Sequence, residues 1–77
     1  MKPSEVIEKA RANCGGWAQL ATTCGATRQS LYRWRNGAVP SPRFWYVLAF
    51  SADVDVAQIL AAWGIGTAVN ARKPLAQ

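Results

Sequence analysis

The chain has 77 residues, of which nine are lysine or arginine and four are aspartate or glutamate, so its formal net charge is +5. A chain of this length folds as one small domain, and its positive charge favours a polyanionic partner. Without histidine and with only two cysteines, it offers neither a zinc ligand set nor a nucleophile paired with a base, so we expect no enzyme, no metal and no cofactor.

The first expected helix is capped by Ser4 and runs to about Asn13, after which two glycines end it. Its inward stripe is small or apolar and consists of Ile7, Ala10 and Cys14. Charged residues fall in every turn, so this segment is not a signal peptide, and no apolar run is long enough to span a membrane. We therefore expect the protein to stay in the cytoplasm, where Cys14 and Cys24 are buried thiols and not a disulfide.

Two short helices are expected next, at about residues 17–23 and 28–36, and a tight turn separates them. Gly25 follows the last periodic residue of the first of these helices, where a left-handed C-terminal cap is wanted. Thr27 precedes the second helix as an N-cap whose hydroxyl accepts a backbone N–H. The residues that recur at helical intervals and that we expect to be buried are Leu20, Ala21, Cys24, Leu31 and Trp34.

Several of these positions match the pattern of a helix-turn-helix: Ala21, Gly25, Leu31 and Trp34, with Leu20, Cys24 and Ala26 as apolar supports. From residue 16 to about residue 60 the chain resembles the Cro and phage-repressor type of domain, the lambda-repressor-like family. The run Trp34-Arg35-Asn36-Gly37, followed by Pro40, also resembles the family's exit from its recognition helix. The sequence departs from the family at Trp17, where the family often carries a glutamine that touches the DNA backbone, and at Cys24, which replaces a larger aliphatic residue.

This resemblance implies an all-α, lambda-repressor-like bundle of about five short helices that contains a helix-turn-helix. It also implies a sequence-specific, double-stranded DNA-binding transcription regulator of a phage or prophage, acting in the cytoplasm of the bacterial host. A Cro-type repressor of this kind occludes a promoter as a homodimer on a near-palindromic operator. No small-molecule ligand is evident from the sequence, and we expect no contact with a membrane.

The expected DNA contacts lie on and around the second helix of the motif. The N-terminal end of a recognition helix points at base edges, where a guanidinium pairs with guanine and a carboxamide pairs with adenine. The expected base contacts are therefore Arg28, Gln29, Ser30 and Arg33. The expected contacts to the DNA backbone, which fix register without reading sequence, are Trp17, Gln19, Thr27, Tyr32, Arg35, Asn36 and Arg43.

Two more helices are expected beyond the loop of residues 37–42. The fourth begins near Ser41 or Pro42, since proline is tolerated in a first turn, and continues to about Ser51. Asp53 or Asp55 caps a fifth helix at about residues 56–63, which Gly64 stops. Residues 1–65 therefore make up the expected domain, and residues 66–77 are expected to be a flexible tail.

The apolar run of residues 44–50 covers every side of the fourth helix, although a surface helix needs an apolar stripe of only about 100°. We expect one side of this run to seal the core over Leu31 and Trp34, namely Phe44, Val47 and Leu48, and the other side to face partly outward, namely Trp45, Tyr46 or Phe50. An exposed apolar cluster of this size marks an interface. The expected contact of a twofold dimer comprises Trp45, Phe50, Ile59, Trp63 and Ile65. The alternative is that the fifth helix buries these residues within one chain.

Positive charge extends over the whole motif, because no acidic residue lies between Glu8 and Asp53. Three alternatives remain open at this point. In the first, the basic face is an ordinary solvated surface. In the second, the domain is a protein-interaction module such as an antitoxin, adaptor or assembly subunit. In the third alternative, the aromatic residues Trp17, Tyr32 and Trp45 stack on RNA bases. Salt-dependent binding to duplex DNA separates an interaction module from a DNA-binding protein.

Overall fold

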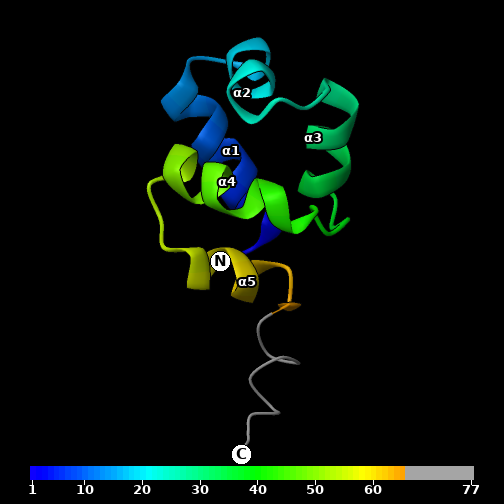
Figure 1. The fold of residues 1–77 in the computed structure, drawn as a ribbon, viewed down its shortest axis with the longest axis vertical. Helices are drawn as coiled ribbons and strands as arrows, with labels where there is room; N and C mark the ends of the chain where they lie inside the picture. Colours follow the sequence, from blue (N-terminus) through cyan, green and yellow to red (C-terminus); the bar gives the residue numbers. More distant parts are fainter. Residues whose placement is uncertain (66–77) are drawn as a thin grey trace, which may run out of the picture.

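Five α-helices pack around one apolar core in the computed structural model, which describes residues 1–65 (Figure 1). In chain order they are α1 (Pro3–Cys14), α2 (Trp17–Cys24), α3 (Arg28–Arg35), α4 (Trp45–Ala52) and α5 (Val56–Ala62). A short 3₁₀ helix, η1 (Pro42–Phe44), leads directly into α4. Residues 1–65 contain no β-strand, so the predicted all-α class and number of helices are confirmed. The expected tail, residues 66–77, lies outside the described residues.

Helix α1 is central, because it contacts each of the other four α-helices. Figure 1 shows α4 crossing in front of it. Val6, Ile7 and Ala10 are fully buried on its inner side, whereas Cys14 is only half-buried. The predicted inward stripe thus holds for Ile7 and Ala10, and the structure adds Val6. The other members of the core are Leu20, Cys24, Leu31, Trp34, Leu48, Ala49, Ala52 and Ile59.

The start of α1 differs from the prediction. Pro3 is the first helical residue and Lys2 is the N-cap, so Ser4 lies inside the first turn and does not cap the helix. The backbone N–H of Lys2 donates to Glu5 Oε1 at 2.7 Å. Proline is favoured at the first helical position because its fixed φ suits a helix and its missing N–H would have no partner there. The helix therefore begins two residues earlier than a cap at Ser4 would place it.

The connection from α2 to α3 is built as the sequence predicts. Gly25 ends α2 in the left-handed conformation, with a φ of 68°, and the N–H of Ala26 donates to the carbonyl oxygen of Ala21 at 3.0 Å. Thr27 is the N-cap of α3, and its Oγ1 accepts the backbone N–H of Ser30 at 3.1 Å. The two caps hold the helices at a fixed angle across a turn of residues 25–27.

Two aspartates organise the connection from α4 to α5. Asp53 ends α4 in a left-handed conformation, with a φ of 57°, and the N–H of Val54 donates to the carbonyl oxygen of Ala49 at 3.0 Å. Asp55 is the N-cap of α5, and its own N–H donates to Gln58 Oε1 at 3.0 Å. Of the two aspartates considered as caps of the fifth helix, Asp55 is therefore the one that takes this position.

The chain bends sharply between these last two helices. Among residues 1–65, no single helix is long and apolar enough to cross a membrane. The segments Pro42–Ala52 and Val56–Ala62 reach the required length and composition only when taken together, and the pair is bent by 111°. As a result of this bend, α5 contacts both α4 and α1.

The apolar run of residues 44–50 is divided between core and surface. Leu48 is fully buried, and the ring of Phe44 packs against the ring of Trp34 with centroids 4.7 Å apart. Tyr46 and Phe50 face outward, with exposed fractions of 73% and 84%. The predicted sealing of the core by one side of this run is confirmed.

Most of the residues expected at a dimer contact are held within the single chain. Ile59 is fully buried, so its prediction as an exposed interface residue is wrong, because α5 turns this side chain into the core. Trp45 and Trp63 are half-buried, and the indole N–H of each donates to a backbone carbonyl oxygen, at 3.0 and 3.1 Å. Ile65 is also half-buried, which leaves Phe50 as the one member of the set that is mostly exposed.

Candidate nucleic-acid interface

The side of α3 that faces away from the core is polar and cationic. Leu31 and Trp34 are buried, which fixes the rotation of the helix about its axis. At about 3.6 residues per turn, the opposite side carries residues that are all exposed. We call this set the outer face of α3: Arg28, Gln29, Tyr32, Arg33 and Asn36.

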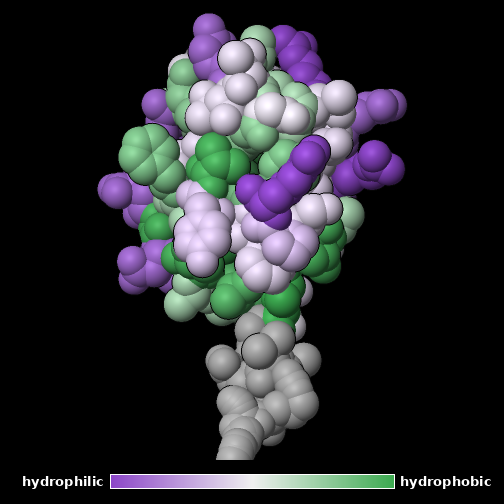
Figure 2. Space-filling model, in the orientation of Figure 1, coloured by the Kyte–Doolittle hydropathy of each residue, from purple (hydrophilic) through white to green (hydrophobic). Residues whose placement is uncertain are grey.

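Helix α3 gives this edge of the molecule a positive charge. Figure 2 shows hydrophilic side chains projecting from the edge at which α3 lies in Figure 1. Helix α3 has the sequence RQSLYRWR, with three arginines, and neither α2 nor α3 contains an acidic residue. A surface with one sign of charge and few compensating groups attracts a polyanion.

The N-terminal end of α3 is fixed by its cap. Thr27 is exposed and Ser30 is half-buried, and the hydroxyl of Thr27 also donates to Ser30 Oγ at 3.1 Å. The side chain of Ser30 is therefore engaged at the edge of the outer face, whereas Arg28 and Gln29 project freely from the first turn. Of the four residues predicted to contact bases, the structure brings Arg28, Gln29 and Arg33 together on one surface and places Ser30 at its border.

Trp17 supports the outer face from the side. It begins α2, is half-buried, and meets the ring of Tyr32 edge to face with centroids 5.0 Å apart. The guanidinium of Arg11 lies 5.4 Å from the centroid of the Trp17 ring, within the range of a cation–π contact. Trp17 thus connects α1, α2 and α3, so packing accounts for a large aromatic side chain at this position.

Arg35 points to α1, away from the outer face. Its Nε–H donates to Glu8 Oε2 at 2.7 Å, and the Nε–H of Arg11 donates to Glu8 Oε1 at 2.9 Å. These hydrogen bonds lower the pKa of Glu8, that from Arg11 most strongly, so its carboxylate is charged at neutral pH. In the sequence, Glu8 was noted only as the last acidic residue before the basic motif. The spacing of three residues between Glu8 and Arg11 indicated a contact between these two side chains. No local sequence pattern relates Glu8 to Arg35, which lies 27 residues away.

The remaining residues predicted to contact the DNA backbone lie around this surface. Gln19 is exposed on α2, near the same end of the helix as Trp17. Arg43 is exposed in η1, and its guanidinium lies 4.7 Å from the centroid of the Phe44 ring. Because the Phe44 ring packs in turn on Trp34, Arg43 is connected to the buried side of α3.

Of the two cysteines, Cys24 is a buried thiol of low reactivity. Burial, with a smaller contribution from Cys14, raises the pKa of the Cys24 thiol to about 11, so little thiolate is present at neutral pH. Both cysteines are free thiols. Within residues 1–65, no group of three or more histidine, cysteine, aspartate or glutamate side chains is placed to hold a metal ion.

No family model, curated protein or solved structure matches this chain. The fold defines it as a small all-helical domain, with five helices in residues 1–65. Its distinguishing surface is a short arginine-rich helix with an exposed polar face, joined through a glycine turn to the helix before it.

Proposed function

We propose that the protein binds double-stranded DNA in a sequence-specific manner, as a helix-turn-helix protein whose recognition helix is α3. The observation that carries this proposal is the outer face of α3, whose residues are all exposed and polar or cationic, while Leu31 and Trp34 on the opposite side are buried. An α-helix with its side chains is about 10–12 Å across, which suits entry into a major groove about 12 Å wide. The turn of residues 25–27, with Gly25 as the C-cap of α2 and Thr27 as the N-cap of α3, is the short connection that this motif requires.

In this proposal the first turn of α3 reads sequence. The guanidinium of Arg28 pairs with guanine O6 and N7, and the carboxamide of Gln29 pairs with adenine N6 and N7. Arg33 lies one turn further along the same row as Gln29 and contacts the next base or its phosphate. Tyr32, held by Trp17, contacts the DNA backbone beside this row.

Phosphate contacts at both ends of the motif position α3 in the groove. Trp17, Gln19 and Thr27 supply them at the N-terminal ends of α2 and α3, where unpaired backbone N–H groups favour anions. Asn36 and Arg43 supply them beyond the C-terminal end of α3. Arg35 contributes through its positive charge, with its Nε–H retained by Glu8.

The more specific form of the proposal is a lambda-repressor-like domain that acts as a Cro-type repressor of a phage or prophage. In this form of the proposal the domain regulates transcription by occupying a promoter. Two copies bind a near-palindromic operator, with half-sites about one helical turn, or roughly 34 Å, apart.

Selection of bound sites from a random duplex pool tests the proposal. We expect a recovered motif with two related half-sites, and an affinity whose logarithm falls linearly with the logarithm of salt concentration. The variant Arg28→Gln with Arg33→Gln should lose the selected motif. The control Lys2→Gln with Lys9→Gln removes the same charge from the N-terminal part of the chain and should retain it. Recovery of no motif and no duplex binding at low salt would contradict the proposal.

One observation favours a second candidate, a protein-interaction module. Tyr46 and Phe50 are exposed on α4, outside the outer face of α3, and large exposed aromatic side chains mark interaction surfaces. A module of this kind would bind no duplex DNA at any salt concentration, so the same titration separates the two candidates.

A further inference from the structure

The segment that joins α3 to η1, residues 36–41, forms neither helix nor strand, and all of its residues except Pro40 are exposed. Exposed segments of this kind are usually the most mobile parts of a small domain. Asn36 and Arg43, to which the proposed function assigns phosphate contacts, lie at the start of this segment and just after its end. What holds this segment, which we call the α3–η1 loop, therefore decides how well both side chains are placed for DNA.

Two indole groups hold the backbone, one just before the α3–η1 loop and one near its end. The indole N–H of Trp63 donates to the carbonyl oxygen of Trp34 at 3.1 Å, and the same oxygen accepts the backbone N–H of Gly37 at 3.0 Å. The indole N–H of Trp45 donates to the carbonyl oxygen of Pro40 at 3.0 Å. Both donor tryptophans are half-buried, so water competes less for these hydrogen bonds than it would at an exposed site.

Side-chain packing closes the loop between these two points. Pro40 is fully buried, and its ring fixes its own φ. The ring of Phe44 packs against the ring of Trp34 with centroids 4.7 Å apart, and the guanidinium of Arg43 lies 4.7 Å from the centroid of the Phe44 ring. The position of Arg43 relative to α3 therefore depends on the contacts that hold the loop.

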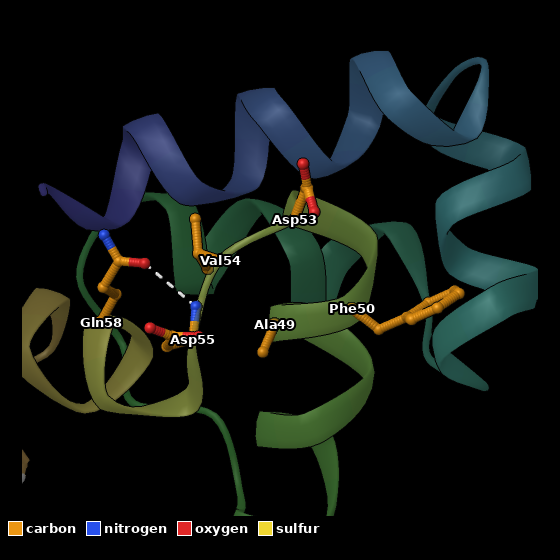
Figure 3. A pocket seen from close by; sticks show the side chains of 6 residues that line it. All are labelled: Ala49, Phe50, Asp53, Val54, Asp55 and Gln58. Carbon is orange, nitrogen blue, oxygen red and sulfur yellow. Dashed lines mark hydrogen bonds between the residues drawn. The ribbon is translucent and has the colours of Figure 1, made fainter.

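The two donor tryptophans come from the last two helices. Trp45 is the first residue of α4, and Trp63 directly follows the last residue of α5. Figure 3 shows the turn between these helices, where the backbone N–H of Asp55 donates to Gln58 Oε1 at 3.0 Å at the start of α5. Because this turn fixes the direction of α5, Trp63 at its far end reaches a residue 29 positions earlier in the chain.

We propose that Trp45 and Trp63 are positioning residues of the DNA-binding surface, whose indole N–H groups fix the α3–η1 loop before DNA is bound. Asn36 and Arg43 are then held ready for phosphates, so less conformational freedom is lost on binding. Phosphate contacts carry no sequence information, so both indoles act on the affinity for every duplex and leave the preferred sequence unchanged. The inference rests on the proposed function for its ligand, and it gives α4 and α5, which lie outside the helix-turn-helix, a role in that function.

The first part of the test needs no DNA and uses hydrogen exchange of the full chain, measured by NMR. Trp45→Phe and Trp63→Phe each keep an aromatic ring and remove the indole N–H. In Trp63→Phe, the backbone N–H of Gly37 should exchange about fivefold faster or more, because the start of the α3–η1 loop is released. In Trp45→Phe, the same increase should appear at the backbone N–H of Phe44, which donates to the carbonyl oxygen of Ser41 at 2.9 Å.

Two controls separate release of the loop from a general loss of stability. The backbone N–H of Ala26 donates to the carbonyl oxygen of Ala21 in the turn between α2 and α3, and it should keep its exchange rate in both variants. Tyr46→Phe removes an exposed hydroxyl from the same helix as Trp45 and should change none of these rates. Equal acceleration at Ala26 and in the α3–η1 loop would mean that the indoles only stabilise the fold, and it would overturn the proposal. Unchanged rates in both tryptophan variants would overturn it as well.

The second part measures affinity for the selected operator and for a random duplex. Trp45→Phe and Trp63→Phe should each weaken both affinities by the same factor, about threefold to tenfold, with the recovered motif unchanged. Tyr46→Phe should bind as the natural chain does. A loop that exchanges faster with no change in affinity, or a change in the recovered motif, would overturn this inference and leave the proposed function standing. A natural chain that binds no duplex would instead contradict the proposed function, and the exchange rates would still show whether the indoles fix the loop.

Discussion

Glu8 of α1 accepts the Nε–H of Arg35 of α3 at 2.7 Å, across 27 positions of the chain. The same carboxylate accepts the Nε–H of Arg11 at 2.9 Å, so a single acidic group holds two guanidinium groups. This contact joins the C-terminal end of α3 to the central helix, on the side away from the outer face. The side chains are partly exposed, so the contact orients α3 more than it stabilises the fold.

The first prediction concerns the pH dependence of this contact. The hydrogen bonds from Arg11 and Arg35 lower the pKa of Glu8 in the folded state. Because the pKa of Glu8 is lower in the folded than in the unfolded state, the contact of its carboxylate with the two arginines stabilises the fold above the unfolded pKa, about 4.3 for glutamate. This stabilisation is lost as the pH falls through the pKa of Glu8 in the folded state. The difference in free energy of unfolding between the natural chain and Glu8→Gln should therefore shrink as the pH falls below about 4. Urea unfolding between pH 3 and pH 7 measures it.

Glu5→Gln is the control for that experiment, because Glu5 lies on the same helix and accepts a hydrogen bond from the backbone of Lys2, not from an arginine. A difference between the natural chain and Glu8→Gln that grows toward low pH would contradict the assignment.

The second prediction concerns the N-cap of α3. Thr27→Ala removes the oxygen that accepts the backbone N–H of Ser30 and should lower the free energy of unfolding by about 1 kcal/mol. Thr27→Ser retains a hydroxyl at this position and should cost only a fraction of that amount. Thr27 is exposed, so neither substitution leaves a cavity in the core. Equal losses in the two variants, measured by urea unfolding, would show that the hydroxyl is not the stabilising group.

The third prediction concerns the turn of the motif. Gly25 has a φ of 68°, and a Cβ added there would meet no atom within 4 Å, so backbone conformation alone determines the cost of substitution. Gly25→Ala should destabilise the fold by about 1–2 kcal/mol, and Gly25→Asn should cost less, since asparagine tolerates the left-handed region better. In thermal unfolding the natural chain should have the highest midpoint temperature, Gly25→Asn the next and Gly25→Ala the lowest. Equal stability of the alanine variant and the natural chain would contradict the observed turn.

The sequence was sufficient for those parts of the fold that local chemistry determines. The left-handed cap at Gly25 and the hydroxyl cap at Thr27 follow from residue type and position, and the structure has both. Leu31 and Trp34 fix the rotation of α3 through helical spacing alone. The predicted start of α1 was wrong because Ser4 and Pro3 are both favourable near a helix N-terminus. In the structure, Pro3 takes the first helical position, so Ser4 lies inside the helix.

Contacts between distant segments could not be predicted in this way. The apolar content of residues 44–65 does not show which side chains α5 buries, so Ile59 was assigned to a surface although it lies in the core. The partnership of Glu8 with Arg35 depends on how α1 and α3 cross, which no local pattern encodes. For the outer face of α3, the sequence indicated Arg28, Gln29 and Arg33, and the half-burial of Ser30 required the structure.

The fourth prediction concerns the two thiols. Burial raises the pKa of Cys24 to about 11, with a smaller contribution from Cys14. Cys24 is buried and Cys14 is half-exposed, so at pH 8 iodoacetamide should modify Cys14 first, and Cys24 only as fast as the chain unfolds. Mass spectrometry after proteolysis distinguishes the two sites. In urea above the unfolding midpoint both should react at similar rates, and rapid modification of Cys24 in the native protein would contradict its burial.

The fifth prediction separates residues that read sequence from residues that only position the protein. Arg28→Ala or Gln29→Ala should weaken binding to the selected operator by about 1–3 kcal/mol and relax the preference at one or two base pairs, because each removes a pairing with a base edge. Arg43→Ala should weaken binding to all duplexes about equally and reduce the salt dependence, because a phosphate contact carries no sequence information. Lys9→Ala removes one positive charge from α1 and serves as the control for net charge. Titrations of each variant against operator and random duplex, at two or more salt concentrations, measure both effects. Losses of the same size on operator and random duplex for Arg28→Ala and Gln29→Ala would mean that the first turn of α3 does not face the bases.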